Sequence, residues 1–253
     1  MAEHHVETTA SNDKYYFLIR RLHSLSGLIP VGVFLCVHLS ANASVLAPGP
    51  AGAEFQISVE RIHILGPLLV PVEIVGIFIP LLFHTIVGFQ ILLTARSNAQ
   101  YYPYGANVRY TLQRATGVIA IVFILYHVWQ MHWFGKGILG GGKFELYDAS
   151  GGPSAAATTA AAIQAAWYIM PLYAIGVLAS VFHLANGVWT LLITWGITIK
   201  PKTQRASGYV CAAFGVLLAV LGLGALSGFQ TFDVHKAAAT GTGHAVTSGE
   251  ERH

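Results

Sequence analysis

The sequence predicts an all-α protein, an integral membrane bundle of five transmembrane helices, and three observations support that fold class. Only 10% of the 253 residues are charged, against about a quarter in soluble domains. Hydrophobic residues make up 54% of the chain, and the mean hydropathy is +0.58. The apolar residues fall into five runs, each long enough to cross a hydrocarbon core of about 30 Å. This composition also predicts that the chain has no nucleic-acid partner.

The five spans follow from the apolar runs and from the polar residues that bound them. The first has Arg20 and Arg21 in its opening turn and contains Pro30, which should kink it in a way that membrane helices tolerate. The fourth is longer than a bilayer requires and should stop at Lys200 and Pro201. We place the spans at residues 17–39, 67–94, 109–133, 163–199 and 207–226.

The remaining stretches are polar or rich in small residues and are expected to lie outside the spans. Residues 1–15 form an N-terminal tail, 16–228 the membrane domain and 229–253 a polar C-terminal tail. A Gly/Pro/Ala-rich loop joins the first two spans. Residues 135–161, rich in Gly, Ala, Ser and Thr, form a loop insertion.

The distribution of Lys and Arg predicts the orientation, because cytoplasmic loops carry an excess of these residues. An N-terminus inside and a C-terminus outside put nine basic residues in the cytoplasm and five outside, and this orientation also leaves the 135–161 insertion outside. The nine are Lys14, Arg20, Arg21, Arg96, Arg109, Arg114, Lys200, Lys202 and Arg205.

Each of the first four spans carries a histidine at membrane depth, where ionisable side chains are costly and usually functional. From the helical rise, His38 and His127 lie roughly 6 to 13 Å below the outer ends of their helices, and His84 and His183 roughly 24 to 25 Å below. A glycine follows His84 and His183 by one helical turn, which should leave a flat space beside each imidazole. The four histidines therefore form two pairs at two depths.

Two facing imidazoles with glycines beside them are suited to a haem b, which needs two axial nitrogens and room for a porphyrin plane. We therefore predict two bis-histidine haems b, one held by His38 and His127 and one by His84 and His183. A single such histidine would be interpreted as a packed residue, but four at matched depths are not explained that way. Zinc is a poor alternative, because it requires four ligands around one point and these histidines lie at two depths. Cys36 and Cys211 lie in apolar runs and are interpreted as buried hydrophobes.

Four motifs give the chain a close resemblance to a known family. They are L-H-S-L-S-G before His38, I-P-L-L-F-H-T-I-V-G around His84, L-Q-R-A-T-G before His127 and F-H-L-A-N-G-V-W around His183. Over residues 16–226 the sequence is similar to the dihaem cytochrome b subunit of succinate dehydrogenase and fumarate reductase. It departs from that pattern in the 135–161 insertion and at Val181, where some members carry an acid.

The resemblance implies a membrane subunit of an oxidoreductase complex in the bacterial inner membrane. A flavoprotein and an iron–sulfur subunit would dock on the cytoplasmic face, with succinate oxidation on a partner subunit. Electrons would pass between succinate or fumarate and a membrane quinone through the two haems, with the same pairing of histidines. The oligomeric state and the direction of catalysis stay open.

The resemblance also focuses attention on a few charged residues. Glu73 lies about 20° off the face of His84 and about 16 Å nearer the outside, where it could exchange quinol protons or simply reach the outer interface. Glu60, just before the same span, is the rival quinone-site acid. Arg21 and Arg114 are candidates for the haem propionates, although topology explains them equally well. A quinone site outside couples turnover to the membrane potential, which favours menaquinone.

Two other classes of function are compatible with histidines inside membrane helices. One is another haem membrane enzyme, such as a hydrogenase or formate dehydrogenase cytochrome or an ascorbate-type electron carrier, which haem stoichiometry and co-purifying subunits would distinguish. The other is a proton-coupled transporter with histidine relays. Transporters of that kind show inverted repeats with broken helices, whereas the motif repeat here is parallel.

Overall fold

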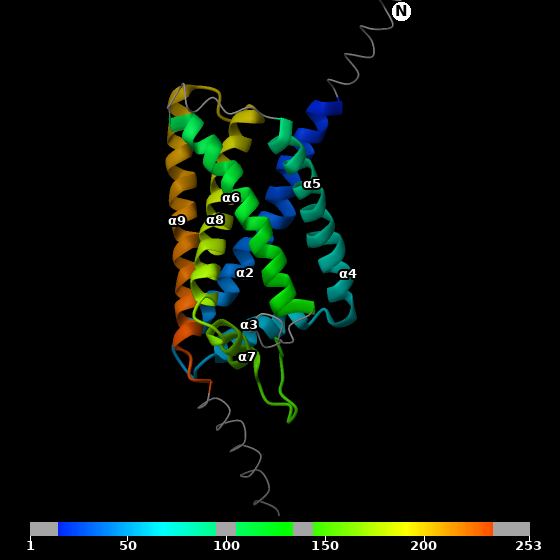
Figure 1. The fold of residues 1–253 in the computed structure, drawn as a ribbon, viewed down its shortest axis with the longest axis vertical. Helices are drawn as coiled ribbons and strands as arrows, with labels where there is room; N and C mark the ends of the chain where they lie inside the picture. The colour runs from blue at the N-terminus through cyan, green and yellow to red at the C-terminus, as the bar shows by residue number, and fades with distance from the viewer. Residues whose placement is uncertain (1–14, 95–104, 134–143, 235–253) are drawn as a thin grey trace, which may run out of the picture. The chain divides into compact units, whose positions relative to one another are not determined.

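Five helices of the computed structural model are long and apolar enough to cross a membrane, which confirms the predicted fold class (Figure 1). The structure describes residues 15–94, 105–133 and 144–234, and within these it contains no strand beyond an isolated bridge between Tyr147 and Pro153. Most of both predicted tails and the start of the predicted insertion lie outside the described residues. The five helices are Tyr15–Leu46, Gly66–Thr94, Asn107–His132, Ile169–Thr194 and Pro201–Thr231.

Prolines shape the first two long helices. Residues 15–26 are helical and continue into a π-helical turn, η1 (Gly27–Gly32), which contains Pro30. Because proline has no N–H to donate, the wider turn absorbs the missing bond without ending the helix, and α2 (Val33–Ala43) and η2 (Ser44–Leu46) follow. The second long helix has a similar π-helical segment, in the order η3 (Gly66–Leu68), α4 (Leu69–Glu73), η4 (Ile74–Phe78) and α5 (Ile79–Thr94).

The last three long helices correct several predicted boundaries. The third comprises α6 (Gly105–Val128) and the π-helical η5 (Trp129–Trp133), close to the prediction. The predicted span 163–199 is wrong at both ends, since α8 is only Ile169–Thr194 and Gly196, at φ +72°, ends it. Pro201 does not stop that helix; it begins α9 (Pro201–Thr231), because the first helical position needs no N–H donor.

Two short helices lie where the sequence indicated only loops. The first, α3 (Ala53–His63), occupies the connection between the first two long helices and buries Phe55 and Val59 on one face. Gly52, just before it, has φ +77°, and a Cβ there would overlap Ala156. The second, α7 (Ala155–Gln164), lies largely within the predicted insertion and buries most of its alanines. The insertion is therefore partly helical, and the loop prediction was wrong in both places.

The chain divides into two compact units, each of which is described separately. The first unit comprises residues 1–35, 67–115 and 182–213, and the second comprises 36–66, 116–181 and 214–253. His84 and His183 fall in the first unit, and His38 and His127 fall in the second. Each predicted histidine pair is thus contained within one unit.

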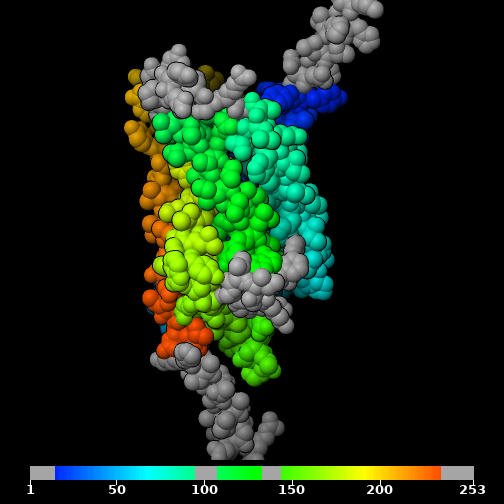
Figure 2. All heavy atoms as spheres, in the orientation of Figure 1, coloured from blue at the N-terminus to red at the C-terminus, as the bar shows by residue number. Residues whose placement is uncertain are grey.

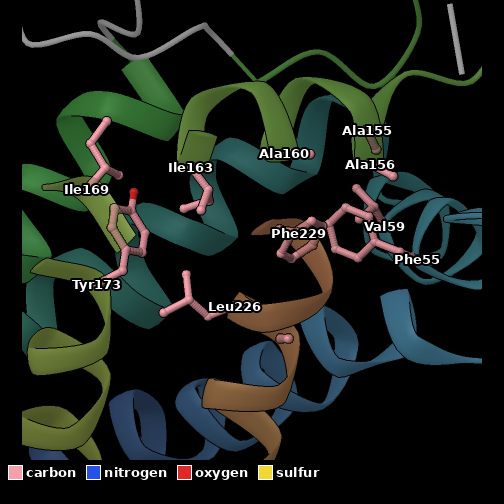
Figure 3. Packing of buried hydrophobic residues seen from close by; sticks show 11 residues of the cluster. Phe55, Val59, Ala155, Ala156, Ala160, Ile163, Ile169, Tyr173, Leu226 and Phe229 are labelled. Atoms are coloured by element: carbon pink, nitrogen blue, oxygen red, sulfur yellow. The ribbon is translucent and has the colours of Figure 1, made fainter. Parts of the chain in front are cut away.

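The second unit has a tightly packed apolar cluster (Figure 3), in which the rings of Phe55 and Phe229 meet edge to face with centres 5.0 Å apart. Its members come from α3, α7, α8 and α9, and include Phe55, Val59, Ala155, Ala156, Ala160, Ile163, Ile169, Tyr173, Leu226 and Phe229. In the first unit, by contrast, the helix formed by α4, η4 and α5 exposes many large apolar side chains. This helix is the cyan part of the surface in Figure 2. An apolar surface of that kind is suited to hydrocarbon.

Candidate functional site

The second unit brings His38 of α2 and His127 of α6 together. Their ring centres are 5.7 Å apart and the planes meet at 75°. Phe123, one turn before His127, lies against the His127 ring with centres 5.8 Å apart. The Nδ1 of His127 lies 3.3 Å from the hydroxyl oxygen of Tyr173 on α8. The predicted pair is therefore formed between two helices, with aromatic side chains around it.

The first unit brings His84 of α5 and His183 of α8 together in a similar way. Their ring centres are 5.9 Å apart and the planes meet at 89°. The Nδ1 of His84 lies 2.8 Å from the His23 carbonyl oxygen, and that of His183 lies 3.0 Å from the Gln113 carbonyl oxygen. Because a carbonyl can only accept, Nδ1 carries the proton in both rings, and Nε2 keeps the lone pair that a metal would need.

A polar network holds the His183 ring between α6 and α8. The side chain of Gln113 donates to the His183 carbonyl at 3.0 Å and accepts from Asn186 at 2.8 Å. Asn186 in turn accepts from Nε of Arg109 at 2.9 Å, and the Arg109 guanidinium lies 3.8 Å from the ring centre of Trp189. Asn186 is 2% exposed, so these bonds are shielded from water and rigidly connect the two helices.

The separation of the rings tests whether a haem iron fits each pair. A metal held by one nitrogen of each of two imidazoles, at about 2 Å per bond, separates the ring centres by about 6 Å. Both pairs match this value. Across the described ranges, no group of three or more His, Cys, Asp or Glu residues could hold a metal ion. Two-histidine pairs suit an ion whose remaining ligands come from a porphyrin.

His23 belongs to the first site as well, although sequence reasoning did not assign it a role. Its ring stacks on that of His84, with centres 4.0 Å apart and planes at 16°. The Nδ1 of His23 and the Nε of Arg21 are both buried and have no hydrogen-bond partner. Buried nitrogens of this kind are costly unless bonded, and they suit the acidic group of a bound molecule. The signal in the sequence was the histidine of L-H-S-L-S-G.

The two arginines proposed for haem propionates differ in their surroundings. The Arg21 guanidinium lies over the rings of Phe17 and Trp195, at 4.3 and 5.0 Å from their centres. Arg114 donates to the carbonyl of Leu92 near the C-terminal end of α5. The geometry therefore gives Arg21 the more available donor and Arg114 a role in holding a helix end.

The glycines near the histidines do not face empty space. A Cβ at Gly88 would lie 3.3 Å from the His23 ring, and one at Gly187 would lie 3.5 Å from the Gln113 amide nitrogen. A Cβ at Gly27 would overlap the His84 ring. The flat spaces expected one turn after His84 and His183 are thus bordered by side chains, and the glycine packed most closely on an imidazole is Gly27.

The two candidate acids lie in different units. Glu73 ends α4 in the first unit and is half-buried. Glu60 lies on α3 in the second unit, where its Oε1 accepts from Gln56 and from the Tyr147 hydroxyl, each at 2.9 Å. The bonds from Gln56 and Tyr147 lower the pKa of Glu60, and the bond to Glu60 raises the pKa of Tyr147. A lowered pKa makes Glu60 a weaker proton acceptor near neutral pH.

Comparison with known proteins identifies relatives of this chain. Residues 102–223 match the family model described as the succinate dehydrogenase/fumarate reductase transmembrane subunit. The chain is also 36% identical over 220 residues to the succinate dehydrogenase cytochrome b558 subunit of Bacillus subtilis (strain 168), an alignment that covers 87% of this chain and 99% of that relative.

Proposed function

Since the chain belongs to the family of succinate dehydrogenase and fumarate reductase transmembrane subunits, as a cytochrome b membrane subunit, we propose that it carries electrons through two haems b between an iron–sulfur subunit and a membrane quinone. The observation that carries this proposal is the facing pair of imidazoles in each unit, with ring centres 5.7 and 5.9 Å apart. Haem b, when bound, supplies a one-electron carrier.

The chain's own residues would hold and orient the two groups. His84 and His183 would ligate one haem, and His38 and His127 the other. In His84, His183 and His127 the available nitrogen is the one opposite the Nδ1 that the backbone or Tyr173 contacts. Fixing Nδ1 in these three rings sets their tautomer and orientation before the ligand binds. Arg21 would neutralise a propionate of the first-unit haem. Arg114 would support that site through α5.

The partners follow from the family and from the surface of the first unit. The connection between α8 and α9 exposes Ile197 and Ile199, at 65% and 77%, next to Lys200 and Lys202. A mixture of exposed apolar and basic side chains at a helix end suits a protein surface better than hydrocarbon. We assign this end to the cytoplasm, with the N-terminus inside and the C-terminus outside, and to the docking of an iron–sulfur subunit and a flavoprotein.

The quinone would exchange protons on the outer side, near the haem held by His38 and His127. Glu73 and Glu60 are the proposed acids for that exchange. Glu73 is favoured because its carboxyl lies on a transmembrane helix, at a depth that an apolar quinone reaches from lipid. The lowered pKa of Glu60 makes it the weaker candidate. Electrons that cross from the cytoplasmic side to this quinone, while protons exchange outside, couple turnover to the membrane potential. Such coupling suits a low-potential quinone such as menaquinone, because its reduction by succinate is uphill.

Purification through an affinity tag on this chain tests the proposed assembly. A flavoprotein and an iron–sulfur protein should co-purify in mild detergent, and the complex should transfer electrons between succinate and a menaquinone analogue. Recovery of the tagged chain alone, with its haem spectrum intact, would show that the proposed docking does not occur.

A further inference from the structure

A chain of three hydrogen bonds runs from the His127 ring to the backbone of α7 in the second unit. The His127 Nδ1 lies 3.3 Å from the Tyr173 hydroxyl oxygen. The Tyr173 hydroxyl donates to Oε1 of Gln130 at 2.8 Å, and Nε2 of Gln130 donates to the Ala162 carbonyl at 3.2 Å. Three different helical segments, α8, η5 and α7, thus contribute to the surroundings of one imidazole.

The Ala162 carbonyl, the last acceptor in the chain, determines the direction of all three bonds. The Ala162 carbonyl only accepts, so the Gln130 amide must present its NH₂ group to it and its oxygen to Tyr173. That amide oxygen also only accepts, so the hydroxyl proton of Tyr173 points to it. The hydroxyl oxygen of Tyr173 can then only accept from His127. Nδ1 of His127 must therefore carry the ring proton and donate it to that oxygen.

Burial keeps water from replacing any of these partners. Gln130 is 2% exposed, Tyr173 is 6% exposed and Ala162 is fully buried. Tyr173 lies inside the apolar cluster, and its hydroxyl oxygen points toward the side of Ile163 and Ile169 rather than toward Leu226 (Figure 3). A buried glutamine and a buried hydroxyl are costly unless each is bonded, so the chain of bonds must be satisfied as a whole.

We propose that Tyr173 and Gln130 are positioning residues for His127, and that they set the imidazole tautomer whose Nε2 is free to bind the iron. This inference rests on the proposed function, in which His127 is a haem ligand. It gives α7 a role at the site, because the Ala162 carbonyl is the acceptor that orients the whole chain of bonds.

The first unit provides a contrast. There the Nδ1 atoms of His84 and His183 bond to backbone carbonyls, which no substitution can remove. Of these three histidines, only His127 bonds to a side-chain hydroxyl. A change at Tyr173 should therefore act on the second-unit haem and leave the first-unit haem unchanged.

Tyr173→Phe removes the hydroxyl oxygen that accepts from His127 Nδ1, and the phenylalanine ring has no hydroxyl that could donate to Nδ1 instead. His127 then becomes a weaker electron donor to the iron, the ferric state loses stabilisation and the potential of one haem rises. Gln130→Met acts differently, because the Tyr173 hydroxyl loses its acceptor and turns its proton toward Nδ1. That favours the wrong tautomer, and the affinity of the site falls by about 10- to 100-fold, as is usual when a supporting partner is lost.

The test is redox potentiometry with a haem count on the purified complex for the parent, Tyr173→Phe, Gln130→Met and the double variant. Tyr126→Phe is the matched control, because the Tyr126 ring lies 6.2 Å from that of Tyr173 and its buried hydroxyl has no partner. We expect a raised potential for one haem in Tyr173→Phe and a haem count near one in Gln130→Met. The double variant should recover the second haem, because no hydroxyl remains to donate to Nδ1 and so keep the ring proton on Nε2.

Two results would overturn the inference. One is a parent-like titration of both haems in Tyr173→Phe and Gln130→Met. The other is a double variant that holds less haem than Gln130→Met, which would indicate a simple loss of packing. An unchanged first-unit haem confirms that each variant is folded. A parent with fewer than two haems would instead contradict the proposed function, so the two failures are distinguishable.

Discussion

The imidazole of His23 stacks on that of His84, with ring centres 4.0 Å apart and planes at 16°, and the backbone carbonyl of His23 accepts the Nδ1–H of His84 at 2.8 Å. One residue of the first long helix therefore fixes both the tilt and the tautomer of a proposed haem ligand on the second. Gly27, one turn after His23, approaches the same ring from the same helix. The contact between these two helices is thus built around His84.

Gly27→Ala should abolish the haem held by His84 and His183 while the other haem remains. The added methyl group would overlap the His84 ring, so either the imidazole or the helix must move. Gly76→Ala is the matched control, because nothing lies within 4 Å of a Cβ there, and alanine is favoured over glycine in a helix by about 1 kcal/mol. Both variants are assayed by the haem content per chain and by the reduced-minus-oxidised spectrum. Two haems in Gly27→Ala would contradict the close approach.

Arg21→Gln should shift the potential of the first-unit haem to more negative values. The guanidinium charge favours the reduced state, and a hydrogen bond to a charged group is worth about 1.5–3 kcal/mol. Arg20→Gln serves as the comparison, because Arg20 is exposed and contacts the Tyr16 ring and hydroxyl. Redox titration of the two variants checks the difference. Equal shifts in both would mean that only the overall charge of this helix end matters.

Much of the site could be predicted because helices have a regular rise and period. The apolar runs located the long helices, and the depths of His38, His84, His127 and His183 along them gave the two pairs that the structure forms. The roles of His23 and of the Tyr173 hydroxyl could not be predicted, because they depend on side-chain packing between helices far apart in sequence.

The short helices α3 and α7 were not predicted, for a different physical reason. α3 alternates polar and apolar residues over eleven positions, and α7 consists largely of alanine and threonine. Neither has the long apolar run that identified the spans. Both become stable by packing on each other and on Phe229 of α9, an arrangement that depends on tertiary contacts rather than local propensity.

The ordinary pKa of a glutamate carboxyl is about 4.3. The pKa of Glu60 should lie below that value, because Gln56 and Tyr147 donate to its ionised form. A carboxyl whose pKa is lowered on folding stabilises the fold above its unfolded pKa. That contribution disappears as the pH falls through the folded pKa. Tyr147→Phe should move the pKa back toward the ordinary value. Carbon-13 NMR of labelled glutamate in detergent measures it, with Glu60→Gln identifying the resonance, and an unaltered pKa in Tyr147→Phe would contradict the bond.

Glu73→Gln should lower quinone-linked activity by about 100-fold or more, the usual contribution of a positioned proton-transfer group. Haem content and succinate oxidation with an artificial acceptor should be unchanged. Glu60→Gln should have the smaller effect, because the bonds from Gln56 and Tyr147 lower the pKa of the Glu60 carboxyl. Turnover assays with a menaquinone analogue distinguish the two. Full activity in the double variant would remove both acids from the mechanism.

The most direct test of the paired imidazoles is the haem count of the purified complex with its ligands replaced one at a time. We predict two haems b per chain in the parent and one in His183→Ala or His84→Ala. The remaining spectrum and potential should be identical in those two variants and should differ from those of His38→Ala and His127→Ala. Retention of two haems in His183→Ala, or the same remaining haem in all four variants, would contradict the assignment of one haem to each pair.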